Sequence, residues 1–389
     1  MALHIEQLYL GCLAQASYLL TDSGEAAVID PRRDVDDLVA RLRAEGLTLR
    51  WIVETHLHAD FVSGHHELAA KTGATIVFGK AAGATFEHRA VSDGDVLPLG
   101  TTTLEVLETP GHTPESICLV AAEGGAPRAV FTGDTLFVGD VGRPDLVGSR
   151  GRSAEEMASL LYDSLHGKLL TLPDDVLVYP AHGAGSLCGK NISKETSSTI
   201  GKERRLNVSL QPMSKEAFVK MATTNLPEVP AYFGRDVALN RGGARSLGEL
   251  PAPEALPPAA VQARVSQGAL VLDIRPATDF AAGHVPGSVN IGLVGDFAVW
   301  SGALLSPETP IVLVLEDERS LREAVTRLAR VGLENVTGYL AGGIAAWRNE
   351  HHPVATLTRL APAELESLLS KDPGITVLDV RRPPEYESC

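Results

Sequence analysis

Hydrophobic and polar positions along the first part of the chain follow a pattern typical of short strands alternating with helices. The apolar runs "AAVID", "LRWIVET" and "ATIVFG" have strand length, and "DVDDLVARLRAEG" and "GHHELAAKTG" between them carry apolar residues at helical spacing. Elements that alternate in this way indicate a layered α/β domain.

Four polar clusters each stand just after a strand-like run, in "WIVETHLHAD", "TTLEVLETPGHT", "RAVFTGDTLF" and "DVLVYPAHG". Loops at one edge of the sheets commonly carry binding groups. We therefore expect that edge to collect His56, His58, Asp60, His112, Asp134 and His182.

The pattern changes near residue 240, where "RGGARSLGELPAPEALPPAA" is rich in Gly, Pro and Ala and has no sustained period. We predict a first domain at 1–240, a linker at 241–257 and a second domain at 258–356. The opening of the second domain, "VLDIRPATDFAAG", is repeated as "VLDVRRPPEYESC" at the end of the chain. Residues 357–389 are therefore interpreted as the start of a truncated further domain, poorly ordered unless it docks.

Composition narrows the class of protein. Of the 389 residues 44% are hydrophobic and 21% charged, as in soluble globular proteins, and no apolar run approaches the roughly 18 residues of a membrane span. The net charge of −15 disfavours nucleic acids and anionic membranes as partners. The start, "MALHIEQLYLGCL", has no signal-peptide pattern, so we expect a cytoplasmic protein with reduced thiols.

The polar clusters have the composition of a metal site. Histidine and carboxylate ligands around an open coordination position suit divalent transition metals. Histidines at i and i+2 after a strand, joined with "PGHT", "TGD" and "PAHG", form a strong combined signal, although any one of them alone is weak. Spacing by itself leaves His58 open as a ligand.

These motifs resemble those of the metallo-β-lactamase superfamily over about the first 235 residues, but Phe61 stands where the motif H-x-H-x-D-H has its last histidine. In that superfamily the missing histidine helps to hold a second metal, together with the residues that match Asp60, Asp134 and His182. A site that has lost this nitrogen donor should bind a second ion poorly.

Within the superfamily, "THLHADFVSGH", "ETPGHTPES", "FTGDTLFVGDVGRPDL" and "YPAHGAGSLCGKNIS" are similar to the persulfide dioxygenases fused to rhodanese-like domains. The resemblance implies an αββα sandwich followed by an α/β rhodanese-like domain with a parallel sheet. It also implies one Fe(II) per chain, held by His56, His112 and Asp134, with His58 beside the ligands. Asp60 and His182 are expected to orient ligands or water.

The activity implied by this resemblance is oxidation of a low-molecular-weight persulfide, such as glutathione persulfide, by O2 to sulfite and free thiol. Arg143 is a candidate anchor for a substrate carboxylate, with a surface arginine as the equal alternative. Cys188 is a candidate for accepting sulfur, with a buried structural thiol as the more favoured alternative. The chain has "AHGAGSLCG" where glutathione-using members have "AHxYxG", so the carrier thiol stays open.

The second domain resembles a rhodanese without its nucleophile. Val314 or Leu315 stands where the rhodanese cysteine is expected, and Glu316, Asp317 and Glu318 follow it. A loop without sulfur and with three acidic side chains cannot accept a persulfide and repels anions. We therefore predict a spacer or docking module.

Two other functions compete with the dioxygenase. One is a thioester hydrolase resembling glyoxalase II, which Phe61 disfavours; the other is a sulfur-binding or regulatory module without turnover. Two zinc ions would favour the hydrolase, and iron binding without oxygen uptake would favour the regulatory module. A homo-oligomer is compatible with the sequence.

Overall fold

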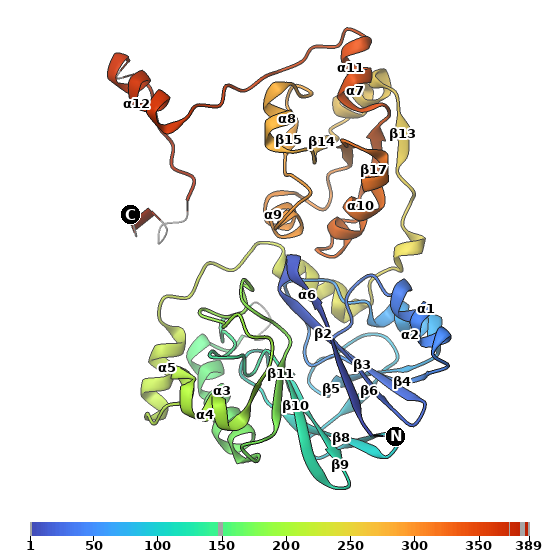
Figure 1. Cartoon of the computed structure of the whole chain (residues 1–389), viewed down its shortest axis with the longest axis vertical. Helices are drawn as coiled ribbons and strands as arrows, with labels where there is room; N and C mark the ends of the chain where they lie inside the picture. Colours follow the sequence, from blue (N-terminus) through green and yellow to red (C-terminus); the bar gives the residue numbers. More distant parts are fainter. Residues whose placement is uncertain (1, 147–150, 373, 382–385, 388–389) are drawn as a thin grey trace.

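The N-terminal half of the protein is built from two six-stranded sheets, as seen in the computed structural model (Figure 1). The structure describes residues 2–146, 151–372, 374–381 and 386–387. The first sheet contains, in spatial order, β1 (His4–Leu10), β2 (Gln15–Asp22), β3 (Glu25–Ile29), β4 (Thr48–Val53), β5 (Thr75–Gly79) and β6 (Arg89–Val91). The second contains β12 (Ser198–Thr199), β11 (Leu177–Pro180), β10 (Ala126–Gly133), β9 (Ile117–Glu123), β8 (Thr102–Glu108) and β7 (Val96–Leu99).

The two sheets pack face to face through alternating apolar side chains. In β8 the buried positions alternate with exposed ones, as expected for a strand with one face in the core. Tyr18, Leu119 and Phe131 lie between the sheets. The parallel strands β4 and β5 are connected through a helix, whereas the antiparallel strands β9 and β10 are joined by a short turn.

Helices cover the outer faces of both sheets, which completes the expected αββα sandwich. Around the first sheet lie α1 (Asp36–Ala44) and α2 (His65–Thr72); around the second lie α3 (Ala154–Gly167), α4 (Ile200–Leu206) and α5 (Lys215–Thr223). Helix α3 begins at a capping box, in which Ser153 Oγ accepts from the Glu156 N–H and Glu156 Oε2 accepts from the Ser153 N–H.

The C-terminal half is a second α/β unit with a five-stranded parallel sheet. Its spatial order is β13 (Glu254–Leu256), β17 (Val336–Leu340), β16 (Ile311–Val314), β14 (Leu270–Asp273) and β15 (Val289–Asn290). The helices of this unit are α7 (Pro258–Ser266), α8 (Ala277–Ala282), α9 (Phe297–Leu304), α10 (Leu321–Ala329) and α11 (Gly343–Asn349). This is the rhodanese-like architecture that the sequence predicts.

The segment predicted as a linker at 241–257 contains regular structure at both ends. Helix α6 (Phe233–Gly242), which packs between the two domains, extends two residues into this range, and β13 near its other end joins the edge of the five-stranded sheet. A Gly- and Pro-rich composition does not exclude such elements when neighbouring domains supply the packing surface and the strand partner.

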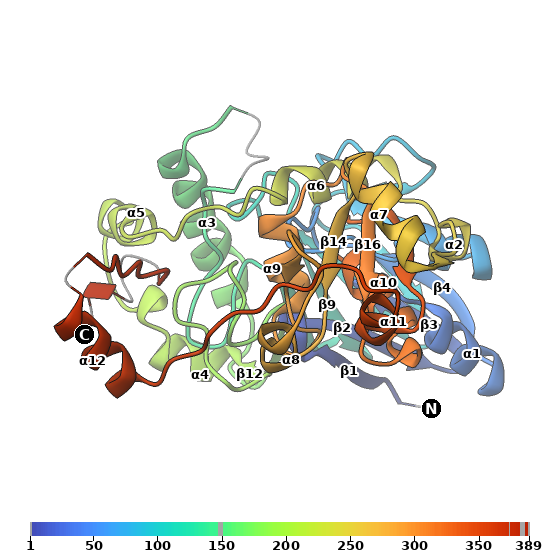
Figure 2. The ribbon, with the colours of Figure 1, turned by 90° about the horizontal axis from the view of Figure 1, so that it is seen from above.

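The two domains share one hydrophobic cluster. It runs from Leu68 and Phe61 of the first domain, through Phe233 of α6, to Phe297 and Val331 of the second domain. Figure 1 shows α9 and α10 at the end of the second domain that faces α6 and the N-terminal domain, and Figure 2 shows the second domain from above, overlying the first. The rhodanese-like domain is therefore docked on the first domain.

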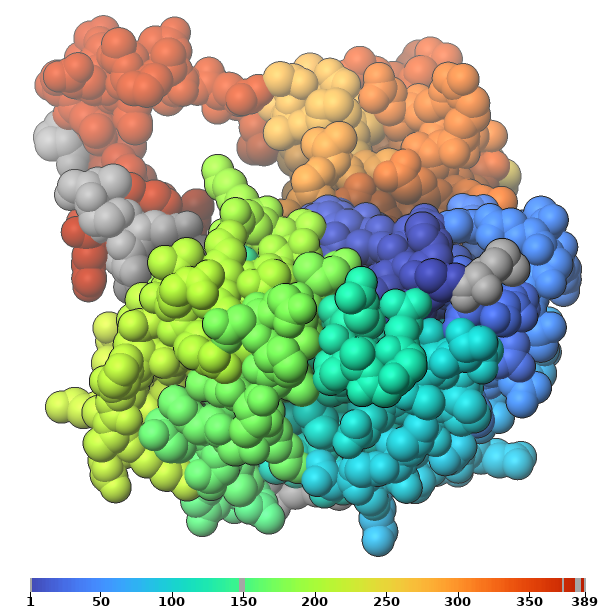
Figure 3. All heavy atoms as spheres, turned by 60° about the horizontal axis from the view of Figure 1, so that its bottom comes forward, coloured from blue at the N-terminus to red at the C-terminus, as the bar shows by residue number. Residues whose placement is uncertain are grey.

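Helix α12 (Pro362–Lys371), which follows the second domain, lies apart from both domains. It stands away from the rest of the molecule in Figures 1 and 3. The repeated motif forms no strand at 377–381, since Leu378 and Val380 are 80% and 85% exposed and a lone strand has no partner. Among the described residues, no helix has the length and apolar character needed to cross a membrane.

Candidate metal centre

The predicted site residues lie at one edge of the sandwich, on loops that follow β4, β8, β10 and β11. The side chains of the six candidates are all buried: His56, His58, Asp60, His112, Asp134 and His182. Only some of them face one another closely, and the structure separates them into three groups.

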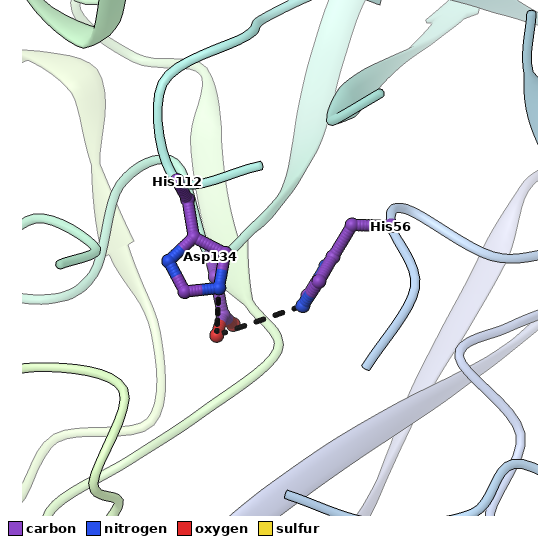
Figure 4. Close-up of side chains that lie close together, drawn as sticks. All are labelled: His56, His112 and Asp134. Atoms are coloured by element: carbon purple, nitrogen blue, oxygen red, sulfur yellow. Dashed lines mark ion pairs between the residues drawn. The ribbon is translucent and has the colours of Figure 1, made fainter. Parts of the chain in front are cut away.

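His56, His112 and Asp134 form the first group, and their nearest ligand atoms all lie within 4.8 Å of one another. Figure 4 shows the two imidazoles pointing at the same carboxylate. Asp134 Oδ2 lies 3.3 Å from His112 Nε2 and 3.8 Å from His56 Nε2. Among the described residues, His112 Nε2 and Asp134 Oδ2 have no hydrogen-bond partner, although both are buried. Such atoms are the ones that a bound cation would satisfy.

The hydrogen bonds behind these ligands fix both imidazoles in the metal-binding tautomer. His112 Nδ1 donates to the Arg143 carbonyl at 2.9 Å. The Thr55 hydroxyl donates to Asp30 Oδ2 at 2.8 Å, so it can only accept from His56 Nδ1, which is 3.0 Å away. Each ring therefore carries its proton on Nδ1 and keeps the Nε2 lone pair for a metal.

The charges of the group also suit a divalent metal. Burial lowers the pKa of His56 well below its usual value and lowers that of His112 as well, so both rings are neutral. Burial would raise the pKa of Asp134, but the His182 imidazole, whose Nδ1 lies 2.7 Å from Asp134 Oδ1, outweighs it and holds this pKa well below 3.8. Two neutral imidazoles and one carboxylate form the donor set expected for Fe(II) or a similar ion.

Two glycines allow the loops to approach this closely. Gly133 has a φ of +51°, and a Cβ there would lie 2.6 Å from Thr55 Oγ1. A Cβ on Gly142 would lie 1.9 Å from the Asp134 carbonyl oxygen and 2.9 Å from His112 Nδ1. Both positions therefore require glycine for the metal ligands to meet.

Asp60, His182 and Cys188 form the second group, next to the first. His182 Nδ1 lies 2.7 Å from Asp134 Oδ1, and its Nε2 lies 2.8 Å from Asp60 Oδ2. Burial alone would lower the pKa of His182, but the Asp134 and Asp60 carboxylates outweigh it and raise this pKa to about 10. His182 therefore connects a metal ligand to a second buried carboxylate.

The Cys188 thiol lies in this group, where its surroundings favour the protonated thiol over the thiolate. Burial raises the pKa of Cys188 well above its usual value, and the Asp60 and Asp134 carboxylates raise it further. A thiol that stays protonated is a poor nucleophile, which disfavours a role in accepting sulfur.

His58 belongs to a third group, with Asp30 and Glu54. Its Nε2 lies 3.0 Å from Asp30 Oδ1 and 3.4 Å from Glu54 Oε2. Burial would lower the pKa of His58, but these two carboxylates raise it well above 6.5. The structure thus places His58 as a cation that supports the loop beside the metal ligands.

Arg143 differs from the expectation for a substrate anchor. Its side chain is buried, Nε and Nη2 bind the Asp145 carboxylate at 2.7 and 2.8 Å, and Nη1 and Nη2 donate to the carbonyls of Leu187 and Pro227. These internal partners occupy the guanidinium, so Arg143 fixes three segments around the site and does not face an incoming carboxylate.

Two further residues support the site without being candidate ligands. Thr55 stands directly before His56 in the motif and sets the tautomer of that ring. Asn240 of α6 binds the loop that carries Asp60, about 180 residues earlier in the chain, and no local pattern could have indicated this contact.

The vestigial rhodanese site lies at the end of β16. Its pocket is lined by Arg275, Leu315, Glu316, Glu318 and the backbone of Gly342 and Gly343. The sequence has no cysteine between residues 257 and 350, so this pocket contains no sulfur nucleophile from its own domain.

Comparison with known proteins agrees with this architecture. The sequence model of the metallo-beta-lactamase superfamily matches residues 10–182, and that of the rhodanese-like domain matches residues 257–350. A probable metallo-hydrolase of Burkholderia pseudomallei is 34% identical over 281 residues, which are 61% of this chain and 90% of that protein. The chain belongs to the metallo-beta-lactamase superfamily.

Relatives within the superfamily include two kinds of enzyme. The human mitochondrial persulfide dioxygenase ETHE1 is 35% identical over 229 residues, which are 58% of this chain and 82% of that protein. A hydroxyacylglutathione hydrolase of a Polaromonas species is 35% identical over 184 residues, 46% of this chain and 66% of that protein. The crystal structure of a metallo-beta-lactamase from Staphylococcus aureus superposes on this protein with a TM-score of 0.80 and 31% sequence identity. The match includes 88% of this chain and 99% of the Staphylococcus aureus chain.

Proposed function

We propose that this protein is a persulfide dioxygenase that uses one Fe(II) per chain. The observation that carries the proposal is the group of His56, His112 and Asp134, in which two buried Nε2 atoms face one carboxylate oxygen. Fe(II) in such a set of two histidines and one carboxylate supplies the redox chemistry with O2. The likeness to persulfide dioxygenase ETHE1 supports the same activity.

The proposed reaction is RSSH + O2 + H2O → RSH + SO3²⁻ + 2 H⁺. The sulfur–sulfur bond breaks, the outer sulfur is oxidised to sulfite, and O2 is the oxidant. Water supplies the third oxygen of sulfite, and the inner sulfur leaves as the thiol. Glutathione persulfide is the substrate that we propose to test first.

The residues around the ligands have defined tasks in this proposal. The pair of His182 and Asp60 holds a proton at His182 and keeps the Asp134 carboxylate in place. The Phe61 ring, whose centroid lies 4.4 Å from that of His58, is 1% exposed and keeps bulk water from this side of the site. The protein thus positions and shields the reactants, which is its main contribution.

Oxygen uptake tests the proposal directly. Protein loaded anaerobically with iron is mixed with glutathione persulfide, and O2 consumption and sulfite are measured in the same sample. We expect about one sulfite for each O2 consumed. Iron-loaded protein that consumes no O2 with this or other small persulfides would contradict the proposal.

A thioester hydrolase is the second candidate, because Asp60 and His182 remain in place and hydroxyacylglutathione hydrolases are among the relatives. Phe61 stands where such an enzyme needs a nitrogen ligand for its second metal. Hydrolysis of a glutathione thioester by the zinc-loaded protein, with two zinc ions per chain, would favour this candidate over the dioxygenase.

A further inference from the structure

The buried side chain of Asn240 binds the loop that carries His56 and Asp60 from outside the metal centre. Asn240 Nδ2 donates to the carbonyls of His58 and Phe61, each at 2.8 Å, and Asn240 Oδ1 accepts from the Ser63 N–H at 2.8 Å. Asn240 is 1% exposed. Both amide protons and the amide oxygen are therefore used to fix the backbone of residues 58–63.

Helix α6, which carries Asn240, is fixed in turn by the rhodanese-like domain. Arg235 donates to the carbonyl of Val331, and a Cβ on Gly332 would lie 2.6 Å from Asp236 Oδ1. At the start of α6, a Cβ on Gly302 of α9 would lie 3.0 Å from the Tyr232 ring. The helix is thus packed closely against two segments of the second domain.

The rhodanese-like domain also reaches the metal loop directly. The Val62 N–H donates to the Arg330 carbonyl at 2.7 Å, one residue after Phe61. The Arg330 side chain lies across the same boundary, with Nε 2.8 Å from Asp34 Oδ1 and Nη1 3.7 Å from Cys12 Sγ. This arginine therefore binds the first domain through both its backbone and its side chain.

A buried ion pair completes the contact. Arg33, which is 2% exposed, donates to Glu334 Oε1 at 2.6 Å and to the Arg245 carbonyl at 2.6 Å. Arg245 Nη2 lies 3.1 Å from the other oxygen of Glu334. Removing one partner of such a pair leaves a buried charge without compensation, so the pair specifies the docked position strongly.

We infer that the rhodanese-like domain supports the metal centre from outside, and that the segment Arg330–Glu334 and Asn240 of α6 clamp the loop that carries His56 and Asp60. Asn240 is a positioning residue, because it acts on the metal ligands through the loop backbone. Metal ligands must be held within about 0.5 Å of their productive positions, which loops rarely achieve without such support. A rhodanese-like domain without a nucleophile thereby has a task that needs no sulfur chemistry.

The first test compares two asparagines that bind backbone carbonyls. Asn290 resembles Asn240 in that its Nδ2 donates to two carbonyls, those of Asp273 and Arg275, but all three residues lie within the rhodanese-like domain. The variants Asn240→Leu and Asn290→Leu are loaded with Co²⁺, and the visible absorption and dissociation constant of the bound Co²⁺ are measured. We expect Asn240→Leu to change the spectrum and to weaken binding by about 10- to 100-fold, and Asn290→Leu to change neither.

The second test changes only the contact between the domains. Glu334→Lys breaks the pairs with Arg33 and Arg245, whereas Glu323→Lys makes the same charge change on α10, in a pair with Arg327 that does not join the two domains. We expect Co²⁺ affinity to fall in Glu334→Lys and to stay unchanged in Glu323→Lys. Unchanged affinity and spectrum in folded Asn240→Leu and Glu334→Lys would overturn the inference.

These measurements do not depend on the dioxygenase proposal. They report metal binding at His56, His112 and Asp134, so a protein that binds Co²⁺ as expected but consumes no O2 would refute the proposed reaction and leave the clamp intact. Conversely, Asn240→Leu and Glu334→Lys variants that bind Co²⁺ unchanged, and that consume O2 when loaded with iron, would refute the clamp and support the proposed reaction.

Discussion

His182 Nδ1 lies 2.7 Å from Asp134 Oδ1, while the other oxygen of the same carboxylate faces His56 and His112. One aspartate is therefore both a candidate metal ligand and the acceptor of a buried imidazole. Asp60 lies on the far side of that imidazole, at 2.8 Å from Nε2. The chain has kept this connection while replacing the neighbouring histidine of the superfamily motif by Phe61.

Replacing His182 by alanine should weaken the metal site without removing it. Asp134 would lose the partner that orients it, and such losses reduce metal affinity or activity by about 10- to 100-fold. The measurement is iron content after dialysis against a chelator. His166→Ala, on α3 and away from the site, is the control; equal iron retention in both variants would contradict the orienting role.

His112→Ala should abolish iron binding and oxygen uptake together, because it removes one of three ligands. Metal analysis of the purified variant checks this. His4, which is exposed on β1, provides the control variant His4→Ala with full iron content. A His112→Ala protein that keeps its iron would remove His112 from the ligand set.

Phe61→His should allow a second metal ion to bind, since Asp60 and His182 are already in place. We expect the metal content to rise from about one to about two ions per chain in excess zinc. Phe61→Leu, which keeps an apolar side chain, should stay at one. No gain in Phe61→His would mean that another feature excludes the second ion.

Cys188→Ser should leave sulfite formation from free persulfide within about twofold of the unmodified protein. The reason is that burial and the nearby carboxylates raise the pKa of this thiol, so it does not supply a thiolate. Sulfite production measured over time decides the matter. A loss of more than tenfold in a folded variant would show that the thiol takes part in the reaction.

The hydrogen bonds of Asp22, at the end of β2, predict that the free energy of unfolding depends on pH. Burial raises the pKa of Asp22, but hydrogen bonds from Thr101, Ser23 and Thr102 outweigh this and lower it to about 2. Because the folded pKa lies below the unfolded value of 3.8, the stabilisation is complete above pH 3.8 and is lost as pH falls through about 2.

Asp22→Asn should therefore lower the free energy of unfolding by about 1–2 kcal/mol at pH 7. Urea unfolding at pH 7 and at pH 3 measures this, and the difference between the two proteins should be smaller at pH 3. A difference that is the same at both values would mean that the charge of Asp22 is not responsible.

The sequence by itself determined the layered α/β character of the first domain and the motif residues, and the resemblance of those motifs to known families implied the αββα sandwich and the rhodanese-like domain. Strand and helix periodicity depend on neighbouring residues, and His56, His112 and Asp134 stand in short motifs directly after strands. The absence of the rhodanese cysteine can likewise be seen directly in the sequence, which has Val314 and Leu315 at the expected position.

Only the tertiary structure decided how these residues are used. It directed His58 to Asp30 and Glu54, occupied Arg143 with internal partners, and placed Asn240, on a helix at the end of the first domain, against the metal loop. These outcomes depend on contacts between segments up to about three hundred residues apart, such as Arg33 with Glu334. Local patterns cannot encode them, because burial and partner distance, which set pKa and tautomer, arise only when the chain is packed.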